Sequence, residues 1–341
     1  MAASRRAQRL TLLAVLPLAL GCSERKLVPA VGPYSDVFLF TERGLRGELL
    51  GGFIDTLTHP VQYVFEEENE FDVFLRDQAQ FPKNRDRKNI LLFVRVDQPG
   101  GLLAQVQKLL GKDALERARR EGHVVYYKED FFARDQDVYF LLAGGAAGEE
   151  VLLSRMATSL RDRLRESTRA RMRENLLRGR ENKGGAKYLM QRYGFSLRFP
   201  SDYHLLQERP ELGAIEIHCE APSRVLGVFW DNDFGGAPTL ADTLRLLAFR
   251  GDVADSLYGG DYLLAGSYRF TAVEQAGRPA LRLEGVWQNE RDMTGGAFVT
   301  YFFWDERRQR LLALDLLLYA PGMAKHPYMR ELEALGTTFA F

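Results

Sequence analysis

Two aspartates separated by one residue stand before a glycine pair in the segment Asp231-Asn232-Asp233-Phe234-Gly235-Gly236. Alternating carboxylates followed by glycine are typical of calcium-binding loops. Here Gly235 takes the fifth loop position, where a ligand side chain is needed, and Asp242 replaces the closing glutamate. Asp242 also follows Thr239 by three residues, as in a helix capping box. We therefore interpret the segment as a strand-to-helix turn and predict no metal site.

The glycine-rich run at residues 144–148 lies between a predicted strand and a predicted helix, where phosphate-binding loops occur. It lacks both the G-x-G-x-x-G spacing and a following Lys-Ser/Thr pair. Glu149 and Glu150 open the helix, and their carboxylates would repel a phosphate while favouring the helix dipole. We predict a plain turn here and no nucleotide cofactor.

Neither H-E-x-x-H nor G-x-S-x-G occurs, and the histidines show no metal-ligand spacing. These are His59, His123, His204, His218 and His326. No catalytic residue, metal or cofactor is predicted from motifs. A periplasmic hydrolase whose triad is assembled from residues scattered along the chain remains an alternative.

The two cysteines differ in context. Cys22 follows an Arg-containing start and the apolar run at 10–20, which is too short to span a bilayer. Gly21 directly before Cys22 resembles the site cut by lipoprotein signal peptidase, although Ala19 stands where leucine is usual. We predict cleavage before Cys22 and lipidation of its thiol, with enough acyl chains for a stable anchor. Cys219 would then have no partner within the chain and, in a strand-like run, reads as a buried structural thiol.

Aromatic residues are dense in the second half of the chain, and packing in a core is the favoured interpretation. The alternative is a cleft that binds a hydrophobic or sugar ligand. For that alternative the binding candidates are Trp230, Asp231, Asp233 and Trp287.

Residues 161–180 hold eight arginines against three acidic residues. A solvated helix face is the favoured interpretation, and contact with anionic head groups, the cell wall or an acidic partner is the alternative. Lysine plus arginine equals aspartate plus glutamate, at 46 each, so the total charge does not favour nucleic acid. Export across the membrane disfavours a nucleic-acid partner further.

Hydrophobic patterning predicts an α/β first half. Strands are expected at 35–40, 61–65, 89–96, 124–127 and 138–142, and helices at 45–57, 102–121 and 149–182. The continuous apolar run at 89–96 is typical of a central strand buried on both faces. Residues 183–185 mark the predicted junction.

The second half is predicted to be an α+β domain with a mainly antiparallel sheet. It opens with the alternating run at 193–200 and continues with strands near 214–219, 225–231, 262–274, 279–289, 296–305 and 310–319. Helices are expected at 239–250 and 326–335. The domain plan is a signal peptide at 1–21, a lipidated tether at 22–35, an α/β domain at 36–182 and the α+β domain at 186–341.

The opening Phe195-Ser196-Leu197-Arg198-Phe199-Pro200 and a helix before the C-terminal Phe341 resemble the PsbP-like α/β/α fold. The longer run at 193–203, together with the lipidation motif, the strand pattern at 35–40, the 87–96 run and the Arg-rich helix, also resembles a family of Gram-negative envelope lipoproteins catalogued as domain of unknown function 4837. The resemblance covers nearly all of the mature chain. It implies an envelope location and supplies no activity or catalytic residue.

Taken together, these features favour a membrane-anchored envelope lipoprotein that acts as a non-enzymatic binding or assembly-accessory module. Ser23, rather than aspartate, follows Cys22, which favours the outer membrane, with the protein facing the periplasm. A membrane contact through the lipid and an envelope protein partner are expected. The alternatives are the periplasmic hydrolase and a structural lipoprotein that contacts the cell wall or anionic lipid through the Arg-rich helix.

Overall fold

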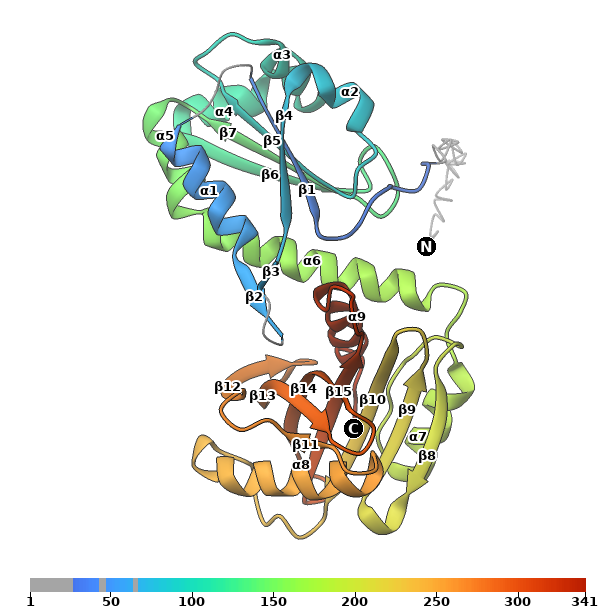
Figure 1. The fold of residues 1–341 in the computed structure, drawn as a ribbon. Coiled ribbons are helices and arrows are strands. Elements are labelled where there is room, and N and C mark those ends of the chain that lie inside the picture. Colours follow the sequence, from blue (N-terminus) through green and yellow to red (C-terminus); the bar gives the residue numbers. More distant parts are fainter. Residues whose placement is uncertain (1–26, 43–46, 64–66) are drawn as a thin grey trace, which may run out of the picture.

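A computed structural model describes residues 27–42, 47–63 and 67–341. It contains two lobes, each built on its own sheet, and the long helix α6 (Ala157–Leu177) runs across the space between them (Figure 1). The α/β class predicted for the first half and the antiparallel sheet predicted for the second half are confirmed.

The N-terminal lobe holds a five-stranded sheet in the order β4-β1-β5-β7-β6, in which β6 is antiparallel to β7 and the other pairs are parallel. Its strands are β1 (Asp36–Thr41), β4 (Asp72–Asp77), β5 (Asn89–Arg95), β6 (His123–Glu129) and β7 (Asp137–Ala143). As predicted, β5 is central and buried on both faces. Ile90 and Leu92 enter one core, whereas Leu91 and Phe93 enter the other.

Helices cover both faces of this sheet. Helices α1 (Glu48–Thr58) and α6 pack on one face, and α3 (Gly101–Leu110) and α4 (Lys112–Glu121) pack on the other. The single helix predicted at 102–121 is therefore wrong, because Gly111, at φ +87°, separates two helices. The helix predicted at 149–182 is also divided, into α5 (Ala146–Glu150), a π-helical turn (Val151–Arg155) and α6. A short helix, α2 (Phe81–Asn84), precedes β5.

A two-stranded extension leaves the N-terminal lobe and reaches the C-terminal lobe (Figure 1). It consists of β2 (Pro60–Gln62) and β3 (Glu67–Asn69), which pair antiparallel. Within β3, Glu68 accepts hydrogen bonds from the backbone N–H groups of Lys325 and His326, at 2.7 and 2.9 Å. These contacts fix the extension to the start of helix α9 (His326–Gly336).

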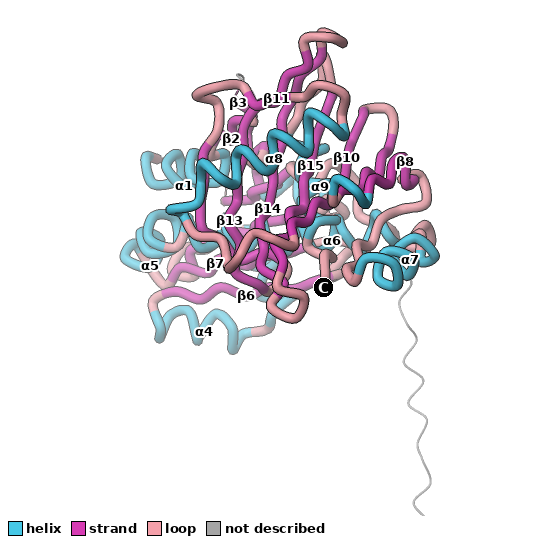
Figure 2. Tube along the Cα trace, turned by 90° about the horizontal axis from the view of Figure 1, so that it is seen from below, coloured by secondary structure: helices cyan, strands magenta, loops and turns pink. Residues whose placement is uncertain are grey.

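The C-terminal lobe holds an antiparallel sheet in the order β11-β13-β14-β15-β10-β9-β8, and β12 also pairs with β13. Its strands are β8 (His204–Arg209), β9 (Ala214–Cys219), β10 (Ser223–Asp231), β11 (Tyr262–Leu263), β12 (Arg269–Gln275), β13 (Arg278–Asn289), β14 (Thr294–Asp305) and β15 (Arg310–Tyr319). Helix α8 (Thr243–Leu257) covers one face, and α7 (Lys183–Tyr193) and α9 cover the other. Figure 2 shows α8 lying across the strands on the lower side of the molecule.

Some helix and strand boundaries in the C-terminal lobe differ from those predicted from the sequence. Residues 183–185, the predicted junction, form the first turn of α7, and Asn182 caps it by accepting a hydrogen bond from the Gly185 N–H at 2.9 Å. The run at 193–200 alternates in burial as predicted but joins no ladder, only isolated bridges at Ser196 and Pro200. The strand predicted at 262–274 is interrupted by a turn at Gly266, with φ +77°. Strand β8 was not predicted.

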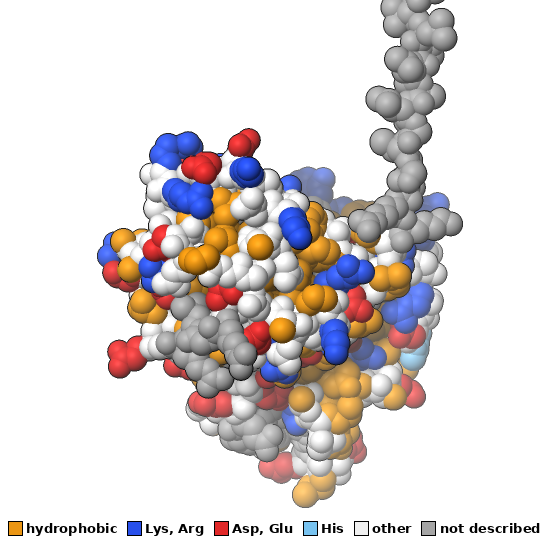
Figure 3. Space-filling model, turned by 90° about the horizontal axis from the view of Figure 1, so that it is seen from above, with side chains coloured by type: hydrophobic (Ala, Val, Ile, Leu, Met, Phe, Trp, Pro, Cys, Tyr) orange, Lys and Arg blue, Asp and Glu red, His pale blue; other side chains and the backbone are white. Residues whose placement is uncertain are grey.

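The upper face of the N-terminal lobe carries basic, acidic and apolar side chains intermingled (Figure 3). The glycines at 144–148 serve packing here, because a Cβ on Gly148 would lie 1.9 Å from the Gly122 carbonyl oxygen. At the start of α3, where an α/β fold could hold an anion, Glu42 Oε1 accepts from the N–H groups of Leu102 and Leu103, at 2.8 and 2.9 Å. A protein carboxylate therefore already occupies that helix terminus.

Candidate functional site

A cavity of about 450 Å³ opens on the α8 side of the C-terminal sheet, and we call it the α8 pocket. Strands β8, β9 and β10 contribute to it, together with ends of β13, β14 and β15 and the segment that follows α8. It is lined by Leu206, Gln207, Glu216, His218, Ser223, Val225, Leu257, Tyr258, Gly259, Asp261, Trp287, Asn289, Asp292, Thr294, Leu317 and Tyr319. Apolar and polar groups thus share one concave surface, which is the usual composition of a ligand site.

A polar row crosses the sheet next to this pocket. In the strand register, Glu216 stands opposite Gly227, Gly227 opposite Asp315 and Asp315 opposite Thr300. Gly227 is required here because a Cβ at this position would lie 2.3 Å from the Tyr258 hydroxyl oxygen. That hydroxyl donates to Asp315 Oδ2 at 3.4 Å, so the row links the sheet to the end of α8.

Asp315 carries the buried counter-charge of Arg250 from α8. Both side chains are fully buried, and two guanidinium nitrogens lie 3.2 Å from the two carboxylate oxygens. The Arg250 guanidinium also stacks 4.4 Å from the centre of the Phe298 ring. A bidentate pair of this kind restricts both partners and holds α8 at a fixed place on the sheet.

Two carboxyl groups in the pocket are buried, and neither binds an arginine or lysine of the described part of the chain. Glu216 is 5% exposed and accepts a hydrogen bond from Gln207 at 3.0 Å. Asp261 is 4% exposed and accepts from Asn289 at 2.8 Å. Burial raises the pKa of Glu216 to about 7 and that of Asp261 to about 6, because loss of water disfavours the charged form.

Trp287 supplies the aromatic wall, together with Tyr319, whose ring centre lies 6.4 Å away. The indole lies against Gly296, where a Cβ would be 3.1 Å from the ring nitrogen. Trp287 is 6% exposed, and its N–H has no hydrogen-bond acceptor among the described residues. A buried donor without an acceptor is costly, so a site that contains one favours a ligand with an acceptor.

Ser223, His218 and Glu216 line the same pocket from the hairpin of β9 and β10. Ser223 Oγ lies 3.0 Å from His218 Nε2, and His218 Nδ1 lies 3.5 Å from Glu216 Oε1. Hydroxyl, imidazole and carboxyl in this order form the arrangement of a Ser-His-Glu triad. Burial, then the charge of nearby His204, lowers the pKa of His218, so the imidazole is neutral and able to take up a proton. The contact to Glu216 is long for a hydrogen bond, and it is the weaker of the two.

Of the four predicted binding candidates, the structure brings Trp287 into the pocket and leaves three outside it. Trp230 lies on the opposite face of the sheet, with its ring centre 5.1 Å from that of Tyr193. Asp231 Oδ1 accepts from the Asp233 N–H at 2.8 Å, as in a turn, and Asp233 is exposed. The capping box of Thr239 and Asp242 is present as predicted.

Of the two cysteine predictions, the structure tests only the one for Cys219. Cys22 lies outside the described residues, so its lipidation remains a prediction. Cys219 is 3% exposed, and burial raises the pKa of its thiol, as expected of a structural cysteine. Its side chain enters the core on the α9 face, whereas His218 faces the pocket.

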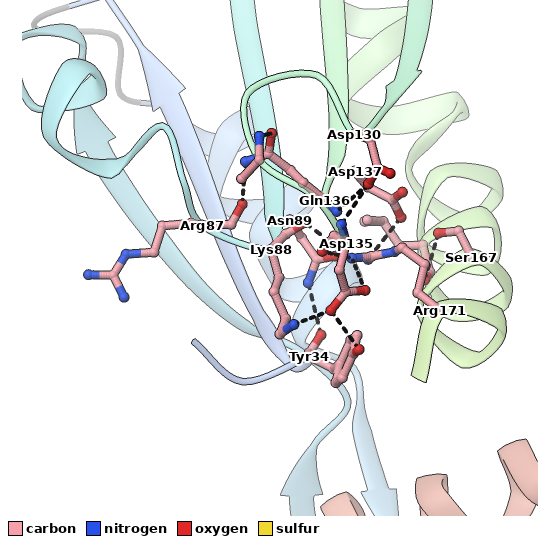
Figure 4. Close-up of polar contacts among 12 residues, drawn as sticks. Tyr34, Arg87, Lys88, Asn89, Asp130, Asp135, Gln136, Asp137, Ser167 and Arg171 are labelled. Atoms are coloured by element: carbon pink, nitrogen blue, oxygen red, sulfur yellow. Dashed lines mark hydrogen bonds and ion pairs between the residues drawn. The ribbon is translucent and has the colours of Figure 1, made fainter. Parts of the chain in front are cut away.

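Several arginines of helix α6 bind carboxylates of the same protein, which a helix face exposed only to solvent would not do. Arg171 is 7% exposed and lies 2.9 Å from the carboxylate of Asp137, at the amino ends of β5 and β7 (Figure 4). It also donates to the Asp135 carbonyl oxygen at 2.9 Å. Asp135 in turn accepts from the Tyr34 hydroxyl at 2.7 Å and pairs with Lys88. This network anchors α6 to the parallel sheet.

The sequence contained one signal for the pocket that was not used. Glu216 and His218 stand two residues apart in a predicted strand, so they share a face, while Ile215 and Ile217 point the other way. Asp261 and Asn289 carried no such signal, because they come from segments brought together only by the sheet order. The triad residues lie within residues 216–223, not scattered along the chain as the hydrolase alternative supposed.

Two properties of the described residues bear on membrane and metal partners. Within residues 27–42, 47–63 and 67–341, no helix has the length and hydropathy needed to cross a bilayer. Among the same residues, no three His, Cys, Asp or Glu side chains gather in a way that could hold a metal ion.

Comparison with known proteins confirms the resemblance to domain of unknown function 4837 for part of the C-terminal lobe; the runs that suggested it lie outside the matched segment. Residues 250–338 match the family described as Domain of unknown function (DUF4837). This segment includes part of α8, strands β11 to β15 and α9, and it supplies Asp261, Trp287 and Asn289 to the α8 pocket. No curated protein matches the chain.

Two solved structures are similar to parts of the chain. One is a protein from Bacteroides thetaiotaomicron VPI-5482, with 15% identity and a TM-score of 0.27 over 43% of this chain and 45% of that one. The match thus spans less than half of that protein's length. The other is LpqN, described as involved in cell envelope biogenesis of Mycobacterium tuberculosis, with 15% identity and a TM-score of 0.28 over 43% of this chain and 82% of that one.

Proposed function

We propose that this protein is a lipid-anchored binding protein of the bacterial cell envelope, and that its α8 pocket binds a neutral, hydroxyl-rich ligand such as a saccharide. One observation carries the binding function. Buried acceptors (Glu216 and Asp261) and a buried donor (Trp287) converge on one aromatic-lined cavity. A hydroxyl group both donates and accepts, so a polyol can satisfy all three groups at once.

The aromatic wall supports the same ligand class. A sugar ring offers an apolar face of C–H groups beside its hydroxyl groups, and the Trp287 and Tyr319 rings offer a flat apolar surface. A cationic ligand is a poorer fit to Glu216, because its raised pKa of about 7 leaves this carboxyl substantially protonated near neutral pH.

The anchor is supported by the sequence around Cys22 and by the segment that follows it. Ala30 and Val31 are docked on the N-terminal lobe, where their N–H groups donate to the carbonyl oxygens of Arg134 and Asp86 at 2.8 and 2.9 Å. Part of the segment expected to be a tether is therefore bound to the lobe. The five residue steps from Cys22 to Leu27 reach at most about 18 Å. We expect the N-terminal lobe to lie against the outer membrane, on its periplasmic side.

Calorimetric titration with a β-1,4-linked tetramer of N-acetylglucosamine tests the binding function. The protein is used as expressed, in a mild detergent without a sugar headgroup. We expect saturable binding that Trp287→Phe weakens about tenfold, since a tenfold change corresponds to about 1.4 kcal/mol, the size of one hydrogen bond. Trp230→Phe is the matched control and should leave the affinity unchanged. No binding, or equal loss in both variants, contradicts the proposal.

A second function, hydrolysis of an ester bound in the α8 pocket, is favoured by the contact between Ser223 and His218. In that reaction Ser223 Oγ would attack the carbonyl carbon while His218 Nε2 takes the hydroxyl proton and returns it to the leaving alcohol. Water would then release the acid from the acyl-serine. A fluorophosphonate probe followed by peptide mass spectrometry tests it. Labelling of Ser223 that is absent in Ser223→Ala supports hydrolysis, and an unlabelled Ser223 excludes a triad-activated serine.

A further inference from the structure

A second and larger cavity, of about 930 Å³, lies between the two lobes, and we call it the inter-lobe cleft. The β2–β3 extension and α6 line it from the N-terminal lobe, and β12, β13 and α9 line it from the C-terminal lobe. It shares no lining residue with the α8 pocket.

Contacts between the lobes hold the walls of this cleft in place. Arg165 of α6 pairs with Glu70 beyond β3, and Arg161 lies 3.8 Å from the same carboxylate. On the other wall, the His326 ring stacks on Tyr63 with ring centres 5.7 Å apart. Burial lowers the pKa of His326 to about 4, so His326 carries no charge near neutral pH. The cleft is therefore preformed, and its charge comes from arginines and glutamates.

The half-buried glutamates Glu333 and Glu284 of the cleft already pair with arginines. Glu333 Oε1 lies 2.7 Å from Arg282 and accepts from the Tyr301 hydroxyl at 3.2 Å. Burial alone would raise the pKa of Glu333, yet Arg282 and Arg169 hold it below its usual range. Glu284 pairs with Arg282 and with Arg269.

Two arginines of the cleft, Arg169 and Arg330, form no salt bridge among the described residues, although the charge of Arg169 acts on Glu333 from a longer distance. Arg330 is 7% exposed, and its Nη2 has no hydrogen-bond partner among the described residues. Its Nη1 donates to the Glu70 carbonyl oxygen at 3.2 Å, and its guanidinium stacks over Phe71. Arg169 lines the cleft from α6, half-buried, and forms no ion pair within the described part of the chain. The lining holds five arginines and five glutamates, so its formal charge is balanced, but Arg169 and Arg330 form no salt bridge among the described residues.

A third donor points to the same ligand chemistry. Gln275, at the end of β12, is 3% exposed, lines the cleft, and leaves its Nε2 without an acceptor among the described residues. Buried donors without partners are rare, and two of them in one cavity call for a ligand rich in acceptors. At the mouth, the exposed Glu67 and Glu274 oppose a ligand with several negative charges.

We propose that the inter-lobe cleft binds a carboxylate group carried on an otherwise neutral molecule, through Arg169 and Arg330, with Gln275 donating to a further oxygen. The planar guanidinium groups match a carboxylate in two-point hydrogen bonding. A single negative charge can be shared by the two arginines that form no salt bridge, and the rim glutamates select against polyanions. The site is independent of the α8 pocket, so the failure of one proposal leaves the other standing.

The test is an NMR titration of the full protein with N-acetylalanine, a carboxylate on a small neutral body. We expect saturable shifts that weaken at least tenfold in Arg169→Gln, a variant that breaks no hydrogen bond or salt bridge among the described residues. Urea unfolding checks that loss of its charge near Glu333 leaves the variant folded. Arg163→Gln is the matched control, since Arg163 is an exposed arginine on the same helix outside the cleft, and it should titrate like the unaltered protein. Arg330→Gln should also lose binding, and urea unfolding of that variant shows whether it is folded.

Two further ligands decide the chemistry. The neutral N-acetylalanine amide should not bind, and equal binding of amide and acid overturns the role of the arginines. Inorganic phosphate should bind more weakly than N-acetylalanine, and tighter phosphate binding overturns the assignment of a carboxylate. Unchanged affinity in Arg169→Gln would falsify the proposal.

Discussion

Replacement of Glu216 by glutamine tests whether the α8 pocket has the character that its burial implies. Glu216 is 5% exposed, and its pKa is raised from 4.5 to about 7, chiefly by burial. Glutamine keeps the size of the side chain and can accept the hydrogen bond from Gln207, but it cannot ionise. The variant therefore removes only the contribution that ionisation of the Glu216 carboxyl makes to the free energy of unfolding.

The sign and size of the effect follow from the two pKa values. A carboxyl whose pKa is raised in the folded state stabilises the fold below its unfolded pKa, and this stability is lost as pH rises through the folded pKa. The interval from 4.5 to about 7 corresponds to about 3 kcal/mol in full. Between pH 5 and pH 8 the unaltered protein should thus lose about 2–3 kcal/mol from this group alone.

Urea unfolding followed by circular dichroism at several pH values from 5 to 8 measures this difference. The free energy of unfolding of Glu216→Gln should rise relative to the unaltered protein by about 2–3 kcal/mol across the range. Glu306→Gln is the matched control, at an exposed glutamate in the turn between β14 and β15, and its difference should stay constant. If Glu216→Gln also keeps a constant difference, the carboxyl is not desolvated and the reasoning about the pocket is wrong.

Further perturbations address the rest of the structure. Arg250→Met leaves Asp315 buried without its cation and should lower the free energy of unfolding by about 3–5 kcal/mol, whereas adding Asp315→Leu should recover most of it; urea unfolding of both variants checks this. Arg171→Met should likewise destabilise by several kcal/mol, because Asp137 is fully buried, and a loss below about 0.5 kcal/mol would contradict the anchoring role of α6. Cys22→Ser should abolish acylation and move the folded protein from the membrane pellet to the soluble fraction, and a variant that stays in the pellet argues against the lipid anchor.

Hydrophobic periodicity predicts correctly those helices and strands that have one apolar and one polar face, or that are bounded by proline or several polar residues. The predicted strands at 214–219 and 310–319 coincide with β9 and β15. Elements were joined wrongly where a single glycine adopts a positive φ, as at Gly111 and Gly266, because glycine is tolerated within a helix or strand pattern and does not by itself announce a break.

The candidate site is formed by strands that are neighbours in the sheet but distant in the sequence. The spacing of residues along the chain does not predict this order of strands. Trp287 was selected from its strand and aromatic type, and it does line the pocket. Asp261 and Asn289 meet only because β11 pairs with β13, and Glu216 joins them from a strand four places away in the sheet order. The partners of Arg171 were equally hidden, since Asp137 begins a parallel strand far from α6 in sequence.

The most direct test of the central claim, that the α8 pocket is a ligand site, is the indole N–H spectrum of the ¹⁵N-labelled protein. Its three tryptophans give three indole resonances, and the one absent from Trp287→Phe identifies Trp287. Addition of the N-acetylglucosamine tetramer should shift this resonance progressively and leave those of Trp230 and Trp304 in place. An unmoved Trp287 resonance, at concentrations where calorimetry detects binding, would contradict the account.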